Sequence, residues 1–367
     1  MKVIISGGGT GGHVFPAIAI ANAIRKERPD ADILFVGAQG KIEMEKVPKA
    51  GYPIEGLWIS GFQRKLTTKN LLFPFKLMGS LAKAYSIVSK FKPDVVVGVG
   101  GYASGPTLEV ASRMGIPIVV QEQNSYPGIT NRLLAKRANR ICVAYEGMDK
   151  FFPKEKVIVT GNPIREGIFD DLVSKKPEGY DYFGLDASKK TIFVFGGSLG
   201  ARTINDAMKA STQHLQDNKN IQVLWQAGKL YIDEMKQTAT AQLPNVVVRQ
   251  FIDRMDLAYA MADIVIGRAG ALTISELCYV GKPAILVPSP NVSEDHQTKN
   301  ALALVNQDAA ILVKDANATK EMIPTALNAI ANAEKLALMT TKISALRKES
   351  AAATIANEII KLAVNAS

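Results

Sequence analysis

The stretch VIISGGGTGGH (residues 3–13) decides the fold of this chain. An apolar β-branched run leads into a glycine-rich turn and then into a helical pattern, which predicts a strand, a tight turn and a helix. The same order returns in IFVFGGSLGAR (residues 192–202). Glycine permits such a turn and lets main-chain N–H groups approach an anion at the helix N-terminus. The two stretches predict two similar α/β domains, whose turns either bind phosphate or are only tight connections.

Outward from these turns, short β-branched runs alternate with helical stretches, as in parallel sheets covered on both faces. A length of 367 residues also favours two domains. We therefore predict an α/β chain of two doubly wound domains. The expected strands are 2–6, 31–37, 94–100, 116–121 and 140–145 in the first half, and 190–196, 221–226, 245–251, 262–267, 282–288 and 309–313 in the second.

The boundary between the domains is expected in GNPIREG (residues 161–167), where Asn162 precedes Pro163 and continued helix is disfavoured. The prediction is an N-terminal domain of residues 1–163 and a C-terminal domain of residues 164–344. A terminal helix, at about residues 345–367, is expected to pack back on the N-terminal domain. The polar segment 175–190 is expected to be an irregular loop.

The composition argues against a disordered or fibrous chain, a membrane-spanning protein and a cysteine-ligated metal site. The content of 47% hydrophobic and 21% charged residues is that of a globular chain. No run reaches the roughly 18 to 20 apolar residues of a membrane span, and the two cysteines, Cys142 and Cys278, lie in apolar segments without metal-ligand spacing. We expect a cytoplasmic protein with both thiols reduced in the core.

Charge is distributed unevenly along the chain. Residues 1–165 contain 23 Lys and Arg against 12 Asp and Glu, whereas the remainder contains 21 against 22. This asymmetry indicates an anionic partner for the first half, either a diphosphate substrate, anionic lipid or nucleic acid. Nucleic acid is not expected, because no aromatic or zinc module accompanies the basic residues.

The first turn also satisfies the dinucleotide pattern GxGxxG, with Gly7, Gly9 and Gly12. A dinucleotide site needs a carboxylate at the end of the second strand for the ribose. That strand ends in FVGAQ (residues 35–39), which has no carboxylate. The sequence therefore argues against a nicotinamide cofactor.

Seven motifs lie in order along the chain, from residue 7 to residue 301. They are GGGTGGHVFPAIAIA (7–21), GVGGYASGP (98–106), EQNSYPGITNR (122–132), GNPIR (161–165), GGSLGAR (196–202), GRAGALTISE (267–276) and DHQTKNA (295–301).

Together these motifs resemble those of the cell-wall N-acetylglucosaminyltransferases of glycosyltransferase family 28. The resemblance implies the GT-B fold, with two Rossmann-like domains separated by a deep cleft. It implies inverting transfer of N-acetylglucosamine from UDP-N-acetylglucosamine to lipid-linked N-acetylmuramyl-pentapeptide, which turns lipid I into lipid II for peptidoglycan synthesis, a step of cell wall biogenesis, cell shape and cell division. One departure is Arg268-Ala269-Gly270-Ala271, where the family more often has RSGA.

Single-displacement chemistry needs one base for the acceptor hydroxyl and a way to stabilise the departing UDP. No DxD-type carboxylate pair is found, so we expect no required cofactor and no bound divalent cation, the diphosphate being held instead by a helix N-terminus. By resemblance, the substrate-binding residues are Thr10, Gly11, Gly12, Asn124, Arg165, Ser198, Ile252, Ala271, Leu272, Thr273, Ile274, Ser275, Glu276 and Gln297.

Some of these residues also have plainer interpretations. Ser198 at a helix start is suited to the diphosphate and equally to an N-cap. Glu276 suits a ribose diol or is a solvated helix residue. Ile252 contacts uracil or is a buried hydrophobe. Gln297 is suited to sugar hydroxyls, Asn124 to the N-acetyl group or the acceptor, and Arg165 to phosphate.

His13 is the preferred candidate for the catalytic base, because it follows the first glycine turn and imidazole titrates near neutrality. The alternative is a structural residue that supports the turn. Glu122 is the reserve candidate.

A basic and apolar segment, residues 64–92, suggests a membrane surface. Seven Arg and Lys residues lie there among Leu, Phe and Met, and no acidic residue occurs between Gly56 and Pro93. This mixture suits peripheral attachment to anionic lipid on the cytoplasmic face of the inner membrane. The alternative is an amphipathic helix that buries its apolar face in its own domain.

Three other functions share parts of this pattern. A UDP-N-acetylglucosamine epimerase of the same fold needs no lipid acceptor, and a diacylglycerol glycosyltransferase uses the same donor. A nucleotide-binding scaffold would keep the turns without needing His13.

Overall fold

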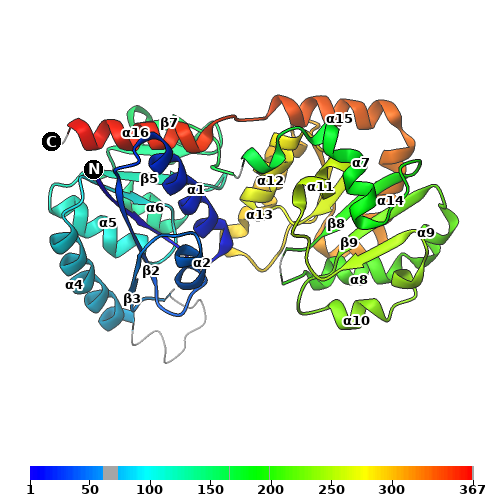
Figure 1. Ribbon diagram of the computed structural model, residues 1–367, viewed down its shortest axis with the longest axis horizontal. Coiled ribbons are helices and arrows are strands. Elements are labelled where there is room, and N and C mark those ends of the chain that lie inside the picture. The colour runs from blue at the N-terminus through cyan, green and yellow to red at the C-terminus, as the bar shows by residue number, and fades with distance from the viewer. Residues whose placement is uncertain (61–72, 165, 198, 366–367) are drawn as a thin grey trace. The chain divides into compact units, whose positions relative to one another are not determined.

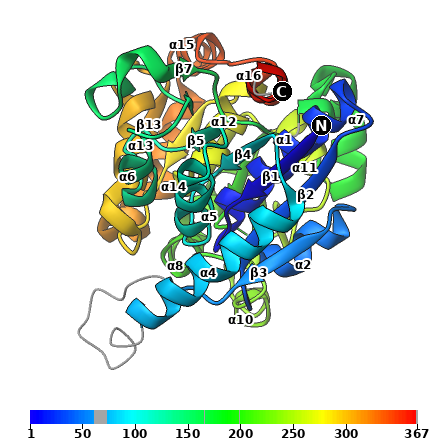
Figure 2. The same ribbon diagram turned by 90° about the vertical axis from the view of Figure 1, so that its left-hand side faces the viewer.

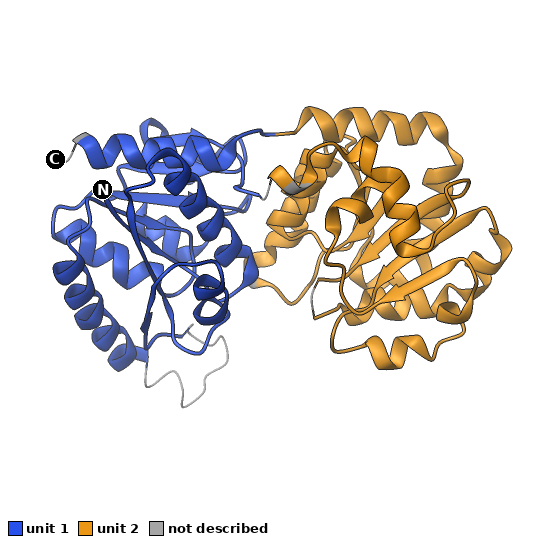
Figure 3. Ribbon diagram, in the orientation of Figure 1, with its two compact units in different colours: residues 1–164, 348–367 blue, residues 165–347 orange. Residues whose placement is uncertain are grey.

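The computed structural model describes residues 1–60, 73–164, 166–197 and 199–365. It divides into two compact units, shown in blue and orange in Figure 3. Unit 1 comprises Met1–Ile164 and Lys348–Ser367, and unit 2 comprises Arg165–Arg347. The boundary between the two units, after Ile164, falls within the GNPIREG segment.

Unit 1 contains a seven-stranded parallel sheet with the order β3-β2-β1-β4-β5-β6-β7 (Figure 1). The order runs outward in both directions from β1 and β4, so the carboxyl ends of these two central strands form the switch point at which doubly wound folds bind ligands. The strands are β1 (Lys2–Ser6), β2 (Asp32–Ala38), β3 (Ile54–Leu57), β4 (Val95–Gly98), β5 (Ile118–Glu122), β6 (Arg140–Val143) and β7 (Val157–Val159).

Helices cover both faces of this sheet because successive side chains of its strands point to opposite faces. Val3 and Ile5 belong to one buried cluster, whereas Ile4 belongs to the other. The helices are α1 (Gly11–Glu27), α2 (Glu43–Lys49), α4 (Phe73–Phe91), α5 (Ser104–Arg113), α6 (Ile129–Leu134) and the terminal α16 (Ala351–Asn365).

Helix α16 belongs to unit 1 although it lies at the end of the chain. It packs along α1, and its Ile355 and Ile359 are fully buried in the same cluster as Ile20 and Ile24 of α1.

Unit 2 has a six-stranded parallel sheet with the order β10-β9-β8-β11-β12-β13. Its central pair is β8 and β11, which repeats the arrangement of unit 1. The strands are β8 (Lys190–Phe195), β9 (Ile221–Gln226), β10 (Val246–Arg249), β11 (Ile264–Gly267), β12 (Ala284–Leu286) and β13 (Ala310–Leu312). The helices are α7 (Leu172–Phe183), α8 (Arg202–Ala210), α9 (Thr212–Asp217), α10 (Ile232–Lys236), α11 (Met255–Met261), α12 (Ala271–Val280), α13 (His296–Val305), α14 (Ala318–Ala331) and α15 (Ala333–Ala345).

The predicted α/β class with two doubly wound parallel sheets is confirmed. Two short strands, β3 and β7, were not predicted, and both are edge strands of unit 1. The predicted loop at 175–190 is wrong in its first half, because α7 extends to Phe183 and packs against α11. Burial of Tyr180 and Phe183 there outweighs the helix-breaking tendency of Pro177 and Gly179.

Both cysteines are free thiols buried in the core, Cys142 on β6 and Cys278 on α12. Burial raises the pKa of each thiol to about 12. Within the described part of the chain, no helix is both long and apolar enough to cross a membrane.

Candidate functional site

The first glycine loop of unit 1 lies at the carboxyl ends of β1 and β4. The Gly8 amide donates to the Gly100 carbonyl at 3.2 Å, which joins the loop after β1 to the loop after β4. A Cβ atom on Gly101 would lie 2.3 Å from the Gly8 oxygen. The two loops therefore pack main chain against main chain, and only glycine fits at this contact.

His13 lies in the first turn of α1, where the loop holds its ring on two sides. Its Nδ1 is 3.0 Å from the carbonyl oxygen of Gly8, with the Thr10 hydroxyl at 3.3 Å. A carbonyl oxygen only accepts hydrogen bonds, so Nδ1 carries the proton and, in the neutral ring, Nε2 carries the lone pair. The other edge of the ring lies against Gly100, where a Cβ atom would be 2.9 Å from Nε2.

Glu122 ends β5 and is 1% exposed. One carboxylate oxygen accepts from the amide and the side chain of Asn124, at 2.9 and 3.1 Å, and the other from Asn131 at 2.8 Å and the Gly128 amide at 3.1 Å. Burial raises the pKa of Glu122, and these hydrogen bonds oppose the rise. The geometry favours Glu122 as the residue that shapes the 122–128 turn rather than as the reserve base.

These contacts connect the predicted unit 1 residues. Thr10, Gly11, Gly12 and His13 form the start of α1, and the Asn131 amide that bonds Glu122 lies 3.8 Å from where a Gly100 Cβ would be. Asn124 is oriented by its two bonds to Glu122.

One residue of this site was missed from the sequence. Glu43, the first residue of α2, is 1% exposed and lies beneath the glycine loop. Its carboxylate accepts from the Gly9 amide at 2.8 Å and from the Ala38 amide at 2.9 Å. In the sequence EMEK (residues 43–46), Glu43 is one of several charged residues of a short helix and looks like a surface residue. Gly8 and Gly37, which make room for its side chain, are the only hint in the sequence that Glu43 is buried.

The corresponding glycine turn of unit 2 follows β8. The turn packs against the loop after β9, where a Cβ on Gly228 would lie 2.1 Å from the Gly200 nitrogen. Gln226, at the end of β9, joins this turn to the loop after β10: its amide donates to the Gly197 carbonyl at 3.0 Å and its oxygen accepts from the Ile252 amide at 2.8 Å. Gln226 is a second residue that the motifs did not reveal.

Ile252 is 1% exposed and its amide is bonded to Gln226. Its side chain is therefore a core residue, which supports the plainer of the two sequence interpretations. The neighbouring Phe251, in contrast, is 55% exposed.

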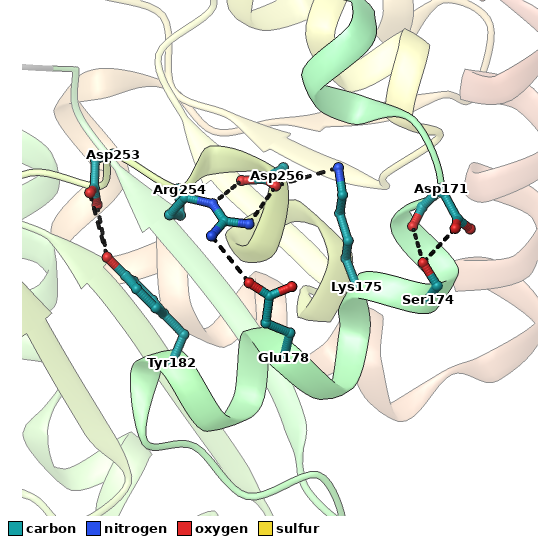
Figure 4. A network of polar contacts seen from close by, with 8 residues as sticks. All are labelled: Asp171, Ser174, Lys175, Glu178, Tyr182, Asp253, Arg254 and Asp256. Carbon is teal, nitrogen blue, oxygen red and sulfur yellow. Dashed lines mark hydrogen bonds and ion pairs between the residues drawn. The ribbon is translucent and has the colours of Figure 1, made fainter.

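A network of polar contacts between α7 and α11 holds the chain immediately after Ile252 (Figure 4). Arg254 bonds both oxygens of Asp256 at 3.0 Å and pairs with Glu178 of α7 at 3.1 Å. Lys175 of α7 also pairs with Asp256, at 3.5 Å. Burial acts to raise the pKa of Asp256, but the hydrogen bond and the charge of Arg254 lower it overall.

Helix α12 carries six of the predicted donor residues. Gly270 is its N-cap and makes no side-chain cap hydrogen bond. Ala271, Leu272 and Thr273 are half-buried in that turn, whereas Ile274 is buried. The Ser275 hydroxyl donates back to the Ala271 carbonyl at 3.0 Å, and Glu276 accepts from Tyr259 at 3.3 Å.

Gln297, in the first turn of α13, accepts from the Ser289 amide through its side-chain oxygen at 2.8 Å. This bond leaves the NH₂ group of Gln297 as the end that can donate to a sugar hydroxyl.

Arg268, in the GRAGA motif, donates to the carbonyls of Val287 and Pro288 and pairs with Asp315. It therefore binds three loops of unit 2 together. Two predicted residues, Arg165 and Ser198, lie outside the described residues.

Two protein-family models match this chain, one in each half. Residues 3–143 match the model of the glycosyltransferase family 28 N-terminal domain, and residues 191–359 match that of the C-terminal domain. The chain belongs to glycosyltransferase family 28.

Named members of family 28 are similar along nearly the whole chain. The UDP-N-acetylglucosamine--N-acetylmuramyl-(pentapeptide) pyrophosphoryl-undecaprenol N-acetylglucosamine transferase of Bacteroides fragilis is 56% identical over 368 residues, covering 99% of this chain and 96% of the relative. The crystal structure of MurG from Acinetobacter baumannii has a TM-score of 0.78 at 28% identity and covers 98% of this chain and 99% of its own.

The family 28 fold is also shared by enzymes of other activity. The UDP-GlcNAc 2-epimerase from Neisseria meningitidis bound to UDP-GlcNAc has a TM-score of 0.69 at 15% identity, with 100% of each chain covered. At that identity the similarity concerns the fold alone. Together, the two parallel sheets and the family 28 match confirm the predicted GT-B fold.

Proposed function

We propose that this chain transfers N-acetylglucosamine from UDP-N-acetylglucosamine to N-acetylmuramyl-(pentapeptide) pyrophosphoryl-undecaprenol, with inversion at the anomeric carbon. The observation that carries the proposal is 56% identity, over nearly the full length of both chains, to a transferase named for this reaction. The residues of each unit suit the two halves of the chemistry, donor binding in unit 2 and deprotonation of the acceptor in unit 1.

On the donor side, the N-cap residues of α8 and α12, Ala201 and Gly270, make no side-chain cap hydrogen bond. The amide groups there, with the partial positive charge of the helix ends, suit the diphosphate and its developing charge as UDP departs. Glu276 is suited to accept from the ribose hydroxyls, and the Gln297 amide to donate to the sugar. No metal ion is required in this scheme.

On the acceptor side, the lone pair of His13 Nε2 takes the proton of the attacking hydroxyl. The acceptor oxygen forms a bond to the anomeric carbon as the bond from that carbon to the diphosphate oxygen breaks. UDP leaves with the electron pair, and the imidazolium later returns its proton to solvent. The hydrogen bond from Nδ1 to Gly8 holds the ring in the required tautomer.

The reaction is tested by measuring UDP release by the full chain, with and without a lipid-linked muramyl-pentapeptide, first in EDTA and then in magnesium. The proposal predicts release that depends on the acceptor and persists in EDTA. Conversion of UDP-N-acetylglucosamine to another UDP-sugar without acceptor would instead identify an epimerase.

Gln226→Leu is predicted to weaken UDP binding by about tenfold, because the buried Gly197 carbonyl and Ile252 amide lose their partner and the loops shift. Gln222→Leu is the matched control, since Gln222 is equally buried at the other end of β9 and bonds Asp186 and Thr191. Calorimetric UDP titration and thermal unfolding of both variants check this. Equal UDP affinity in the two variants, at similar losses of stability, would contradict it.

We further propose that α4 attaches the protein to anionic lipid on the cytoplasmic face of the membrane. The helix buries Ser80, Ala84, Ile87 and Val88 in unit 1, where it packs against α5 and β3 (Figure 2). This burial agrees with the alternative that the helix packs its apolar face into its own domain. Three large apolar side chains nevertheless remain on its outer surface: Phe75 is 68%, Met78 69% and Tyr85 58% exposed.

The spacing of these three residues places them along one stripe of the helix. Trp58, 53% exposed, lies beneath the Lys76 ammonium group at 5.5 Å. Lys90 is exposed on the same helix, and Lys83 is exposed but pairs with Glu55 at 3.4 Å. The helix therefore combines exposed apolar side chains with lysines, and an unpaired lysine near an anionic bilayer contributes about 1 kcal/mol of attraction. The predicted segment 64–92 begins outside the described residues, so the proposal rests on its α4 part.

Combined Phe75→Ser and Met78→Ser substitution is predicted to reduce binding to phosphatidylglycerol liposomes at least about tenfold without loss of thermal stability, because both side chains are already exposed. Val173→Ser, at an 88% exposed position of α7, is the control. Cosedimentation at low and high salt measures the effect. Unchanged binding of the double variant, or no binding of the wild type at low salt, would refute the attachment.

A further inference from the structure

A single peptide group in the first glycine loop is hydrogen-bonded at both ends. The carbonyl oxygen of Gly8 accepts from His13 Nδ1 at 3.0 Å, and the N–H of Gly9, in the same peptide plane, donates to Glu43 at 2.8 Å. An unbroken chain of two hydrogen bonds therefore runs from the imidazole through the peptide to a carboxylate.

Glu43 is built into this position by its surroundings. A Cβ on Gly8 would lie 2.2 Å from the Glu43 carboxyl carbon, and one on Gly37 would lie 2.5 Å from its Cγ, so two glycines make room for the side chain. Its second oxygen accepts from Ala38 N at 2.9 Å. Both partners are N–H donors, which suits a carboxylate, whereas an amide would turn an NH₂ group toward one of them.

We propose that Glu43 is a positioning residue for His13 that acts through the Gly8–Gly9 peptide; this rests on the proposed role of His13 as base. Negative charge at the N–H end of the peptide polarises it and makes the Gly8 oxygen a stronger acceptor. The bond to Nδ1–H strengthens most when Nε2 takes a proton and the ring becomes cationic. Glu43 thus fixes the tautomer and raises the basicity of His13, as an aspartate does directly in a Ser-His-Asp triad.

Among the described residues, a second carboxylate, Glu122, is linked to the imidazole through Asn131 and Gly100. Lys2 and Asp32 lie at the amino ends of β1 and β2, opposite the loop. The charged residues of α1 lie near its C-terminal end. The charged residues of α2 other than Glu43 form ion pairs with one another, and on α16 Glu358 pairs with both Lys361 and Arg140. They are Arg25, Lys26 and Glu27 on α1, Glu45, Lys46 and Lys49 on α2, and Glu358 and Lys361 on α16.

Substitution of Glu43 by Gln removes the charge at nearly constant size. We expect the pKa of His13 to fall, because the imidazolium loses its stabilising charge, and the acidic limb of the pH–rate profile to move to lower pH with it. The turnover number should fall by about tenfold or more, as expected for a weaker and less well oriented base. The KM for UDP-N-acetylglucosamine should change less than the turnover number, because Glu276 and Gln297, which are proposed to bind the donor, lie in unit 2.

The pKa of His13 is measured by NMR in the full chain, which has only three histidines. Glu45→Gln on the same helix is the control, since Glu45 forms surface pairs with Lys46 and Lys49. A folded Glu43→Gln protein with an unchanged His13 pKa would overturn the proposal, even if its stability fell.

A second measurement needs no variant and decides the question if Glu43→Gln fails to fold. In the wild type, the Gly9 amide resonance should titrate with the pKa of His13, because both share one peptide group; a Gly9 resonance that ignores this titration would overturn the proposal. The pKa linkage is independent of turnover. Full activity in a His13 variant would remove the base assignment without changing these NMR results.

Discussion

Main-chain groups of the glycine loops need hydrogen-bond partners, and the rest of the site depends on how this need is met. All strands in both sheets are parallel, so the loops at their carboxyl ends gather at one edge of each sheet. Glycine lets these loops pack tightly but leaves them without side chains to hold them in place. Polar side chains supply these partners. The buried Glu43 and Gln226 bond the glycine turns after β1 and β8, the buried Glu122 bonds Gly128 in its own turn, and the half-buried Arg268 bonds the carbonyls after β12.

Hydrogen-bond partners also distinguish the two candidate bases, Glu122 and His13. Glu122 uses both oxygens for four hydrogen bonds in a buried turn, so its chemistry is structural. His13 uses Nδ1 for the loop, and its neutral ring keeps the lone pair on Nε2. The preferred and the reserve candidate therefore differ in what their hydrogen bonds do: those of Glu122 shape a turn, and that of His13 Nδ1 fixes the tautomer of the ring.

Sequence periodicity predicted the central strands well, because KVIIS and IFVF are apolar runs bounded by glycine. It missed IEGL and VIV, the short edge strands β3 and β7, and it read residues 175–190 as a loop because the segment is polar. Motifs located His13 and Glu276, but Glu43 and Gln226 stand outside the quoted motifs. Their roles come from long-range contacts that no local pattern encodes.

The most direct test of the account is a comparison of turnover and UDP affinity in His13→Ala. If His13 removes the acceptor proton and the donor is bound by unit 2, the turnover number should fall by about 100-fold or more, while the dissociation constant for UDP stays nearly unchanged. Near-normal turnover in this variant would contradict the central claim that the first glycine loop exists to hold a catalytic imidazole.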